Sequence, residues 1–441
     1  MRIRTHPLTR EIIKISWPMI ISELSDSIYS VTDTYFVSKL GTIALGAVGI
    51  GSYLSWTFFV VIALFSTGVL IYASQSYGSG DIEKVRHSVG ETLVYATAVA
   101  FIVGVTAYYF SPALISLIAG KNTSVINDGV AYFSVRILGL PILAFVVILD
   151  STLRAIGATR YSMIAILSSV AINIVLDPLL IFGLLGFPKL GVVGAALATV
   201  ISIAYMIPVE LYLLSKLGVR PIPEIKLEHI GSITKIGLPA ASERLVFSMG
   251  HNIYLAFIAR CGSIALAAHQ IGVRIESFIY MPGYAFSVAS STLVGQRIGA
   301  GRFEEAMEVG WRVTRIAILV MAALGVIVAA TSQYIVAPFS PTDDVAILAS
   351  IYLILAGLSE PGLALAMALS GAIRGGGNTL IPMIISISGL YLFRILPALY
   401  LINLYGVVGA WIAMFIDVYL RGIVFTIIYK KYFLRLAKKV I

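Results

Sequence analysis

Two aspartates stand inside long apolar segments of this sequence, where few ionisable side chains occur. Asp33 lies in the first apolar segment, and Asp177 lies in the fifth, directly before Pro178. Near the centre of a lipid bilayer a charged side chain costs at least ~2.5–3.5 kcal/mol, so an acid in a membrane span is a functional candidate by default. Carboxylates in such a place can bind a proton or a small cation.

Other ionisable residues share this apolar setting. Five of them, in the second half of the chain, are candidates for a polar cavity within the membrane: Glu243, Glu276, Arg274, Glu360 and Arg394. Glu210 and Asp417 lie nearer to the ends of their segments, so a second interpretation stays open for them. Their side chains can extend to polar surroundings without any functional role.

The segments that carry these residues are predicted to be membrane-spanning helices. Of the 441 residues, 59% are hydrophobic and 12% are charged, against about 45–50% and 25% in soluble domains. Twelve spans of about 20 residues leave room for short connections only, and unbroken apolar runs of this length form helices. The twelve segments are centred near Ser25, Val60, Ala100, Gly139, Ile172, Ser202, Gly250, Tyr280, Met321, Gly357, Ser388 and Met414.

The distribution of lysine and arginine predicts the orientation. Most of these residues lie at the two ends of the chain and in the loops after the even-numbered segments. The opposite loops hold few, namely Lys39, Lys121, Lys189 and Arg260. By the positive-inside rule, both termini are cytoplasmic, and the protein is a multi-pass protein of the cell membrane.

An internal repeat divides the chain into two halves. A shift of 221 residues places Gly41–Gly51 (GTIALGAVGIG) on Gly262–Gly272 (GSIALAAHQIG), with seven of eleven residues identical. The same shift pairs Pro18 with Pro239, and a shift of 220 pairs Arg154 with Arg374. Because six helices separate the copies, the repeats are parallel and related by a pseudo-two-fold axis along the membrane normal. We predict an N lobe (1–216), a cytoplasmic linker (217–232) and a C lobe (233–441), each lobe with six helices.

Four polar residues of the N lobe are expected at one depth. Asp33 lies five residues before the expected end of its helix, Asp177 seven before, and Thr199 eight after the start of its own. At 1.5 Å per residue these depths agree within about one turn, and Asn173 shares the helical face of Asp177. Asp33, Asn173, Asp177 and Thr199 therefore form a predicted H⁺ or Na⁺ site, in which burial and like charge disfavour ionisation of both acids. Separate packing roles for the four residues are the alternative.

Pro18 lies inside the first apolar segment. A proline within a helix removes a backbone hydrogen bond and bends the helix. Both a moving hinge and a static bend are consistent with its position.

Several function classes find no support in the sequence. Cys261 is the single cysteine and there are five scattered histidines, which makes a zinc site improbable. The net charge of +9 forms no single patch, as nucleic-acid binding would require. No phosphate-binding loop or cofactor motif is present. We expect neither an enzyme nor a cofactor beyond a coupling ion.

Several motifs resemble those of the multidrug and toxic compound extrusion (MATE) family, and in particular its prokaryotic DinF-like branch. They are SWPMIISELSDSIYSVTDTYFVSKLG from Ser16, NIVLDPLLIFG from Asn173, QSYGSG from Gln75, and LRAIGAT from Leu153 with its repeat IRGGGNT. The resemblance implies that Asp33 and Asp177 bind the coupling cation with Asn173 and Thr199, and that helix one bends at Pro18. Other branches have an acid where this chain has Phe247, which favours coupling through the N lobe.

Two transport functions follow as hypotheses. The resemblance implies an antiporter that uses H⁺ or Na⁺ to export organic, often cationic, compounds by alternating access. We expect it to be a monomer surrounded by membrane lipid. The alternative is a flippase of a lipid-linked saccharide or another amphiphile. Flippases of that kind usually need a strongly basic cavity, and few basic residues of this chain lie within the predicted spans.

Overall fold

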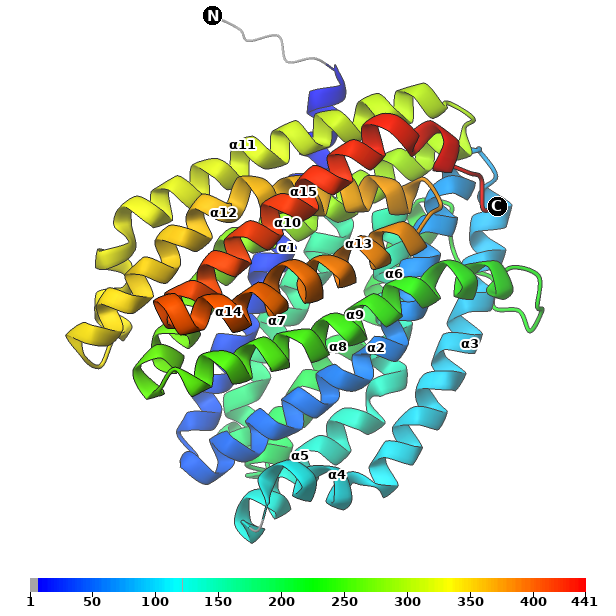
Figure 1. The fold of residues 1–441 in the computed structure, drawn as a ribbon. Helices are drawn as coiled ribbons and strands as arrows, with labels where there is room; N and C mark the ends of the chain where they lie inside the picture. The colour runs from blue at the N-terminus through cyan, green and yellow to red at the C-terminus, as the bar shows by residue number, and fades with distance from the viewer. Residues whose placement is uncertain (1–6, 121) are drawn as a thin grey trace, which may run out of the picture. The chain divides into compact units, whose positions relative to one another are not determined.

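The structure is a computed structural model, and it describes residues 7–441 except residue 121. The side chain of Asp26 also lies outside the described residues, as does Lys121. The described part of the chain contains helices and no β-strand, which confirms the predicted all-α class (Figure 1).

Twelve membrane spans account for nearly all of the described chain. The first six are formed by α1 (Pro7–Ser38), α2 (Thr42–Gly78), α3 (Ile82–Tyr109), the pair α5 (Thr123–Leu138) and α6 (Leu140–Ala155), α7 (Thr159–Phe182) and α8 (Val192–Lys216). The short helix α4 (Ser111–Ala119) precedes the α5–α6 pair, which is bent by 46°. The short 3-10 helix η1 (Leu184–Gly186) lies between α7 and α8.

The second half repeats this order. Its spans are α9 (Ile230–Arg260), α10 (Ser263–Gly299), α11 (Phe303–Val336), α12 (Asp343–Gly375), the series α13 (Leu380–Ser388), η3 (Gly389–Ile395) and α14 (Leu396–Tyr405), and α15 (Val407–Leu436). The 3-10 turn η2 (Ala337–Phe339) follows α11, and η3 is a π-helix. All twelve predicted centres fall in these spans, with Gly139 at the bend between α5 and α6.

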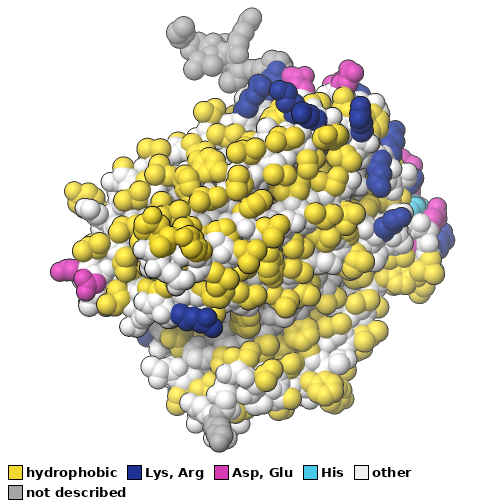
Figure 2. Space-filling view, viewed as in Figure 1, with side chains coloured by type: hydrophobic (Ala, Val, Ile, Leu, Met, Phe, Trp, Pro, Cys, Tyr) yellow, Lys and Arg dark blue, Asp and Glu magenta, His cyan; other side chains and the backbone are white. Residues whose placement is uncertain are grey.

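Length and apolarity qualify most of these helices as spans on their own. Among the described residues, eight spans are long enough and apolar enough to cross a membrane, and the bent α5–α6 pair makes a ninth if it is counted as one span. The helices α1, α9 and α10 are long enough, at 32, 31 and 37 residues, but are less apolar on average than those eight spans. Hydrophobic side chains cover most of the visible surface, while lysines and arginines gather mainly along one edge (Figure 2). This surface is that of a multi-pass membrane protein.

The repeated glycine motif builds the same local structure twice. Gly41 and Gly262 have φ of 111° and 106° and precede α2 and α10, a conformation that L side chains rarely adopt. At the last residue of each motif, a Cβ at Gly51 would overlap the Tyr132 ring, and a Cβ at Gly272 would overlap the ring of Tyr352. The repeated glycines therefore fix both a turn and a close helix contact.

The helices form two compact units, which we call the N unit (21–238) and the C unit (the remaining residues). The division falls within α1, between Ile20 and Ile21, and within α9, between Leu238 and Pro239. Each of these two helices thus has residues in both units, and the change occurs beside the repeat-related prolines Pro18 and Pro239. Pro18 itself is buried, and α1 is continuous through it.

The polar linker between α8 and α9 lies against α3 of the N unit. The Ile222 amide donates to the Arg86 carbonyl at 3.0 Å, and a Cβ at Gly90 would overlap the Ile222 carbonyl. The Glu91 carboxylate accepts from the amides of His229 (3.0 Å) and Ile230 (3.2 Å) at the start of α9. A carboxylate at a helix N-terminus satisfies amides that have no partner within the helix. Hydrogen bonds to α3 therefore hold the linker at Ile222 and again where α9 begins.

Candidate cation-coupling site

The centre of the candidate site lies on α7. Asn173 and Asp177 are one turn apart, and both are fully buried. The Asn173 side-chain amide donates to the Asp177 carboxylate at 3.3 Å. Asn173 Oδ1 and Asp177 Oδ2 are buried and have no hydrogen-bond partner among the described residues. Two oxygen acceptors are thus available within one turn of helix.

Thr199 faces this region from α8. Its side chain is buried, and its hydroxyl donates to the Ala195 carbonyl of the same helix at 3.0 Å. This leaves the lone pairs of the Thr199 oxygen available for a cation. The hydroxyl of Tyr29, on α1, lies next to the hydroxyls of Thr199 and Ser202 without a hydrogen bond of normal geometry.

Asp33 follows Tyr29 by one turn of α1. It is half-buried, and its Oδ1 is buried without a hydrogen-bond partner in the described structure. The negative charges of Asp33 and Asp177 act on each other, and the positive charge of Arg136, in the last turn of α5, acts on Asp33. The two acids and their polar neighbours therefore belong to one electrostatic unit.

The donor set has one negative charge in excess. Two carboxylates and the guanidinium of Arg136 sum to one negative charge, which a single H⁺ or Na⁺ would neutralise. The free acceptors are carboxylate, amide and hydroxyl oxygens, which suit a hard cation, and a carboxylate can equally take a proton. The residues present fit either ion.

The sequence interpretation missed three residues of this unit, namely Tyr29, Tyr132 and Arg136. Tyr132 is buried on α5, its hydroxyl lies 3.1 Å from that of Ser52, and the charges of Asp33, Asp177 and Arg136 all act on it. The helical spacing of four between Tyr29 and Asp33, and between Tyr132 and Arg136, was the available signal.

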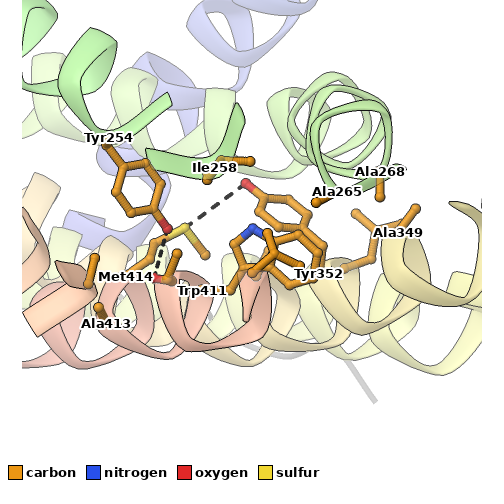
Figure 3. Close-up of a cluster of buried hydrophobic side chains, with 14 of the residues drawn as sticks. Tyr254, Ile258, Ala265, Ala268, Ala349, Tyr352, Trp411, Ala413 and Met414 are labelled. Atoms are coloured by element: carbon orange, nitrogen blue, oxygen red, sulfur yellow. Dashed lines mark hydrogen bonds between the residues drawn. The ribbon is translucent and has the colours of Figure 1, made fainter. Parts of the chain in front are cut away.

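The repeat-related positions of the C unit carry no acid. A shift of 221 places Tyr254 at the position of Asp33. A shift of 219, which pairs Pro178 with Pro397, places Leu396 at that of Asp177. A shift of 215, which pairs GVVGA at Gly191 with GVVGA at Gly406, places Met414 at that of Thr199. Tyr254 and Met414 belong to a cluster of buried hydrophobic side chains with Trp411 and Tyr352 (Figure 3). The Tyr254 hydroxyl donates to the Ala410 carbonyl at 2.8 Å. Packed side chains occupy this part of the C unit.

A partly buried ion pair is present in both halves. Arg154 contacts Glu23 at 2.9 Å in the N unit, and Arg374 contacts Glu243 at 2.7 Å in the C unit. The two arginines are related by the shift of 220, whereas Glu243 lies one residue before Arg244, the position that the shift of 221 relates to Glu23. Glu243, a candidate for the C-lobe cavity, therefore has a guanidinium counter-charge.

The other candidates of the C lobe have different surroundings. Arg394 is buried on the π-helix η3 and contacts Asp417 at 2.9 Å, and Arg421 contacts the same carboxylate at 2.7 Å. Glu276 accepts a hydrogen bond from Tyr352. Glu360 is fully buried, and neither carboxylate oxygen has a hydrogen-bond partner among the described residues.

The side chain of Arg274 is exposed on α10. Asp417 and Glu210 are both 0% exposed. The interpretation in which they extend to the polar surface is wrong, because their helices turn these positions toward neighbouring helices.

Comparisons with known proteins agree with this architecture. The MatE family model matches residues 18–179 and 239–400, which together exceed half of the chain. A probable multidrug resistance protein NorM of Thermotoga maritima is 28% identical over 428 residues, which cover 94% of this chain and 90% of that protein. An FAD transporter of Shewanella oneidensis is 29% identical over 321 residues, covering 68% of each.

Solved structures share the fold. The Vibrio cholerae MATE transporter VcmN, in the bent form, superimposes with a TM-score of 0.90 over 97% of both chains at 19% identity. The duplicated helical order, the repeated glycine and proline positions and the two-segment family match lead to one assignment: the chain belongs to the MatE family, the multidrug and toxic compound extrusion transporters that its motifs resemble.

Proposed function

We propose that this protein is an antiporter that exports small organic, often cationic, compounds by alternating access and is driven by H⁺ or Na⁺. The observation that carries the proposal is the excess negative charge of the Asp33–Asp177 unit, with buried oxygens that lack partners. Unpaired buried polar atoms are costly, so a cation that binds to these oxygens stabilises the unit.

The coupling follows from how the ion changes this unit. With the ion bound, Asp33 on α1 and Asp177 on α7 share a positive charge and attract each other through it. Without the ion the carboxylates repel, which favours a different position of α1. Pro18 lies at the place where α1 leaves the N unit, so it supplies the hinge. The ion then selects between two states that differ in affinity for the exported compound.

The proposal includes the substrate class and the surroundings of the transporter. A cationic compound competes with the coupling ion for the same excess negative charge, and the multidrug resistance proteins among the relatives support this class. We propose a monomer in the cell membrane with cytoplasmic termini, built of lobes 1–216 and 233–441 and a cytoplasmic linker, 217–232. The confinement of the whole site to one unit supports a monomer. We infer no enzymatic activity and no cofactor beyond the coupling ion.

Transport by the purified protein in vesicles tests this function. Proteoliposomes are equilibrated with the same concentration of a fluorescent organic cation on both sides, and an inward H⁺ or Na⁺ gradient is imposed. We expect export against the concentration gradient of the dye with at least one of the two ions. Equal dye fluxes with and without either gradient would contradict the antiporter.

A second candidate is the movement of an anionic amphiphile, such as a lipid-linked saccharide, between the leaflets. Two buried guanidiniums, Arg394 and Arg421, share the single carboxylate of Asp417, and the FAD transporter is a relative with an anionic substrate. The charge of Glu276 also acts on Arg394, which cancels this positive excess and favours the first candidate. Labelled lipid headgroups that change leaflet in the same vesicles would support the second.

A further inference from the structure

A second buried acid lies on the same helix as Thr199. Glu210 is 0% exposed, and both of its carboxylate oxygens lack a hydrogen-bond partner in the described structure. The charges that act on it are those of Asp150 and Arg154, both from α6. Glu210, Asp150 and Arg154 do not belong to the Asp33–Asp177 unit described above.

The neighbouring groups leave Glu210 without a counter-charge. The guanidinium of Arg154 contacts Asp150 at 2.7 Å and Glu23, from α1, at 2.9 Å. Ser162, from α7, donates a further hydrogen bond to Asp150. The carboxylates of Glu23, Asp150 and Glu210 thus share the one guanidinium of Arg154. Those of Glu23 and Asp150 are already bonded to it, and that of Glu210 is not. Because an unpaired buried carboxylate is far more costly than its neutral form, Glu210 must hold a proton in this state.

Helical register connects Glu210 to the coupling site. Thr199, Ser202, Met206 and Glu210 follow one buried face of α8 at spacings of three, four and four residues. Eleven residues separate Thr199 from Glu210, a distance of about 16 Å along the axis. Three residues beyond Thr199, the Ser169 hydroxyl of α7 donates to the Ser202 carbonyl at 2.7 Å. Polar groups therefore extend from the coupling site toward Glu210.

An apolar layer interrupts this polar path. Val146, Ala165 and Met206 are buried and pack together, one each from α6, α7 and α8. Four partly buried side chains complete the layer: Ile166, Ile203, Ile207 and Val209. In sequence the layer lies between Ser202 and Glu210 on α8, and between Ser169 and Ser162 on α7. It separates the two polar regions of the N unit in this state.

We propose that Glu210, with Asp150 and Arg154, is a second proton-binding site that exchanges its proton with the Asp33–Asp177 unit when the apolar layer opens. The exchange rests on the proposed ion-coupled transport, whereas the binding of a proton by Glu210 does not. The ligand is a proton and not Na⁺, because the nearby oxygens of Asp150 are already bonded. The C unit has Phe425 at the position related to Glu210 by a shift of 215, so this site belongs to the N unit alone.

Infrared difference spectroscopy of the purified protein tests the binding of a proton directly. A protonated buried carboxyl has a carbonyl stretching band that its ionised form lacks. We expect one such band to disappear in Glu210→Gln and to shift in Glu210→Asp, while Asp33→Asn retains it. Glu308→Gln, which removes an exposed acid of α11, is the matched control and should leave the band unchanged. A band that is unchanged in Glu210→Gln overturns the site.

Transport measurements test the exchange. In proteoliposomes that export the dye under a proton gradient, Glu210→Gln should reduce turnover by about tenfold or more and leave dye binding unaltered. Wild-type turnover in Glu210→Gln overturns the exchange, even if the band is lost. If the wild-type protein shows no gradient-driven export, the proposed function fails, while the infrared result still decides whether Glu210 binds a proton.

Discussion

The N and C units keep the same architecture but differ in how their buried charges are compensated. Both have a glycine turn and a glycine–tyrosine contact at repeat-related positions, and both have a Glu–Arg pair whose arginines are repeat-related. At the coupling site, however, Asp33 of the N unit corresponds to Tyr254 of the C unit, which is packed in a hydrophobic cluster (Figure 3). Duplicated features therefore build the fold, and the differences between the copies indicate function.

Charge compensation distinguishes Asp417 from the coupling acids. In the C unit, the Asp417 carboxylate is bonded to two guanidiniums, whereas Glu360 is buried with no hydrogen-bond partner for either oxygen among the described residues. In the N unit, buried oxygens of Asp33, Asp177 and Glu210 have no partner among the described residues. A compensated buried charge contributes to one defined structure, whereas an uncompensated one is available to a ligand.

The largest expected effect is the loss of coupling when either site acid is neutralised. Asp33→Asn and Asp177→Asn should each abolish gradient-driven export, because the excess negative charge disappears. The double variant should be no worse than either single one, since the two acids act as a unit. Asn173→Ala and Thr199→Ala each remove one oxygen and should weaken coupling more mildly. Dye export from proteoliposomes measures all five, and additive losses would show that the acids act independently.

Thermal unfolding in detergent should separate the two units by the sign of the effect. Asp417→Asn leaves Arg394 and Arg421 buried without a counter-charge, and we expect it to lose about 3–5 kcal/mol of stability. Asp177→Asn removes a negative charge that is in excess, so its melting temperature should stay equal or rise. A melting temperature lowered equally by both substitutions would remove the distinction between the units.

The repeated ion pair provides a matched test with a smaller effect. Glu243→Gln removes the counter-charge of Arg374 and should cost about 1–3 kcal/mol, because the pair is partly exposed. Glu23→Gln should cost less, because Arg154 keeps its contact with Asp150. Glu243→Gln should reduce coupling less than Asp177→Asn does. Coupling that is lost more completely in Glu243→Gln would place the cation site in the C unit.

Pro18→Ala should have the smallest effect on structure and a moderate effect on rate. Alanine restores the backbone hydrogen bond that proline lacks, which stiffens α1 where it passes from one unit to the other. We expect dye affinity to persist while turnover falls several-fold. Equilibrium binding and initial export rates separate the two quantities, and unchanged turnover would make Pro18 a static bend.

The fold could be predicted from the sequence because membrane spans depend on local composition. Apolar runs of about 20 residues identify spans, and identities such as GTIALGAVGIG with GSIALAAHQIG establish the repeat without tertiary information. The division of α1 at Ile20 could not be predicted. It depends on which helices pack against each section, and apolarity does not distinguish between partners.

Only part of the candidate site could be predicted from the sequence. Axial depth grouped Asp33 with Asp177, since rise per residue is fixed. Depth says nothing about rotation between helices, so Arg136 and Tyr132, which lie on α5, were missed. Glu210 was misjudged because its distance from the helix end suggested access to the surface. Its buried position follows from packing against α6, as the charges of Asp150 and Arg154 acting on it indicate.

The most direct test compares Asp33→Asn with Tyr254→Phe in parallel vesicle preparations at equal protein content. The two residues hold repeat-related positions, so each substitution removes one polar function from the same place in one of the two halves. We expect that Asp33→Asn reduces gradient-driven dye export to the level without a gradient, while Tyr254→Phe keeps most of it. Full export by Asp33→Asn, or abolished export by a correctly folded Tyr254→Phe, would contradict coupling through the N unit.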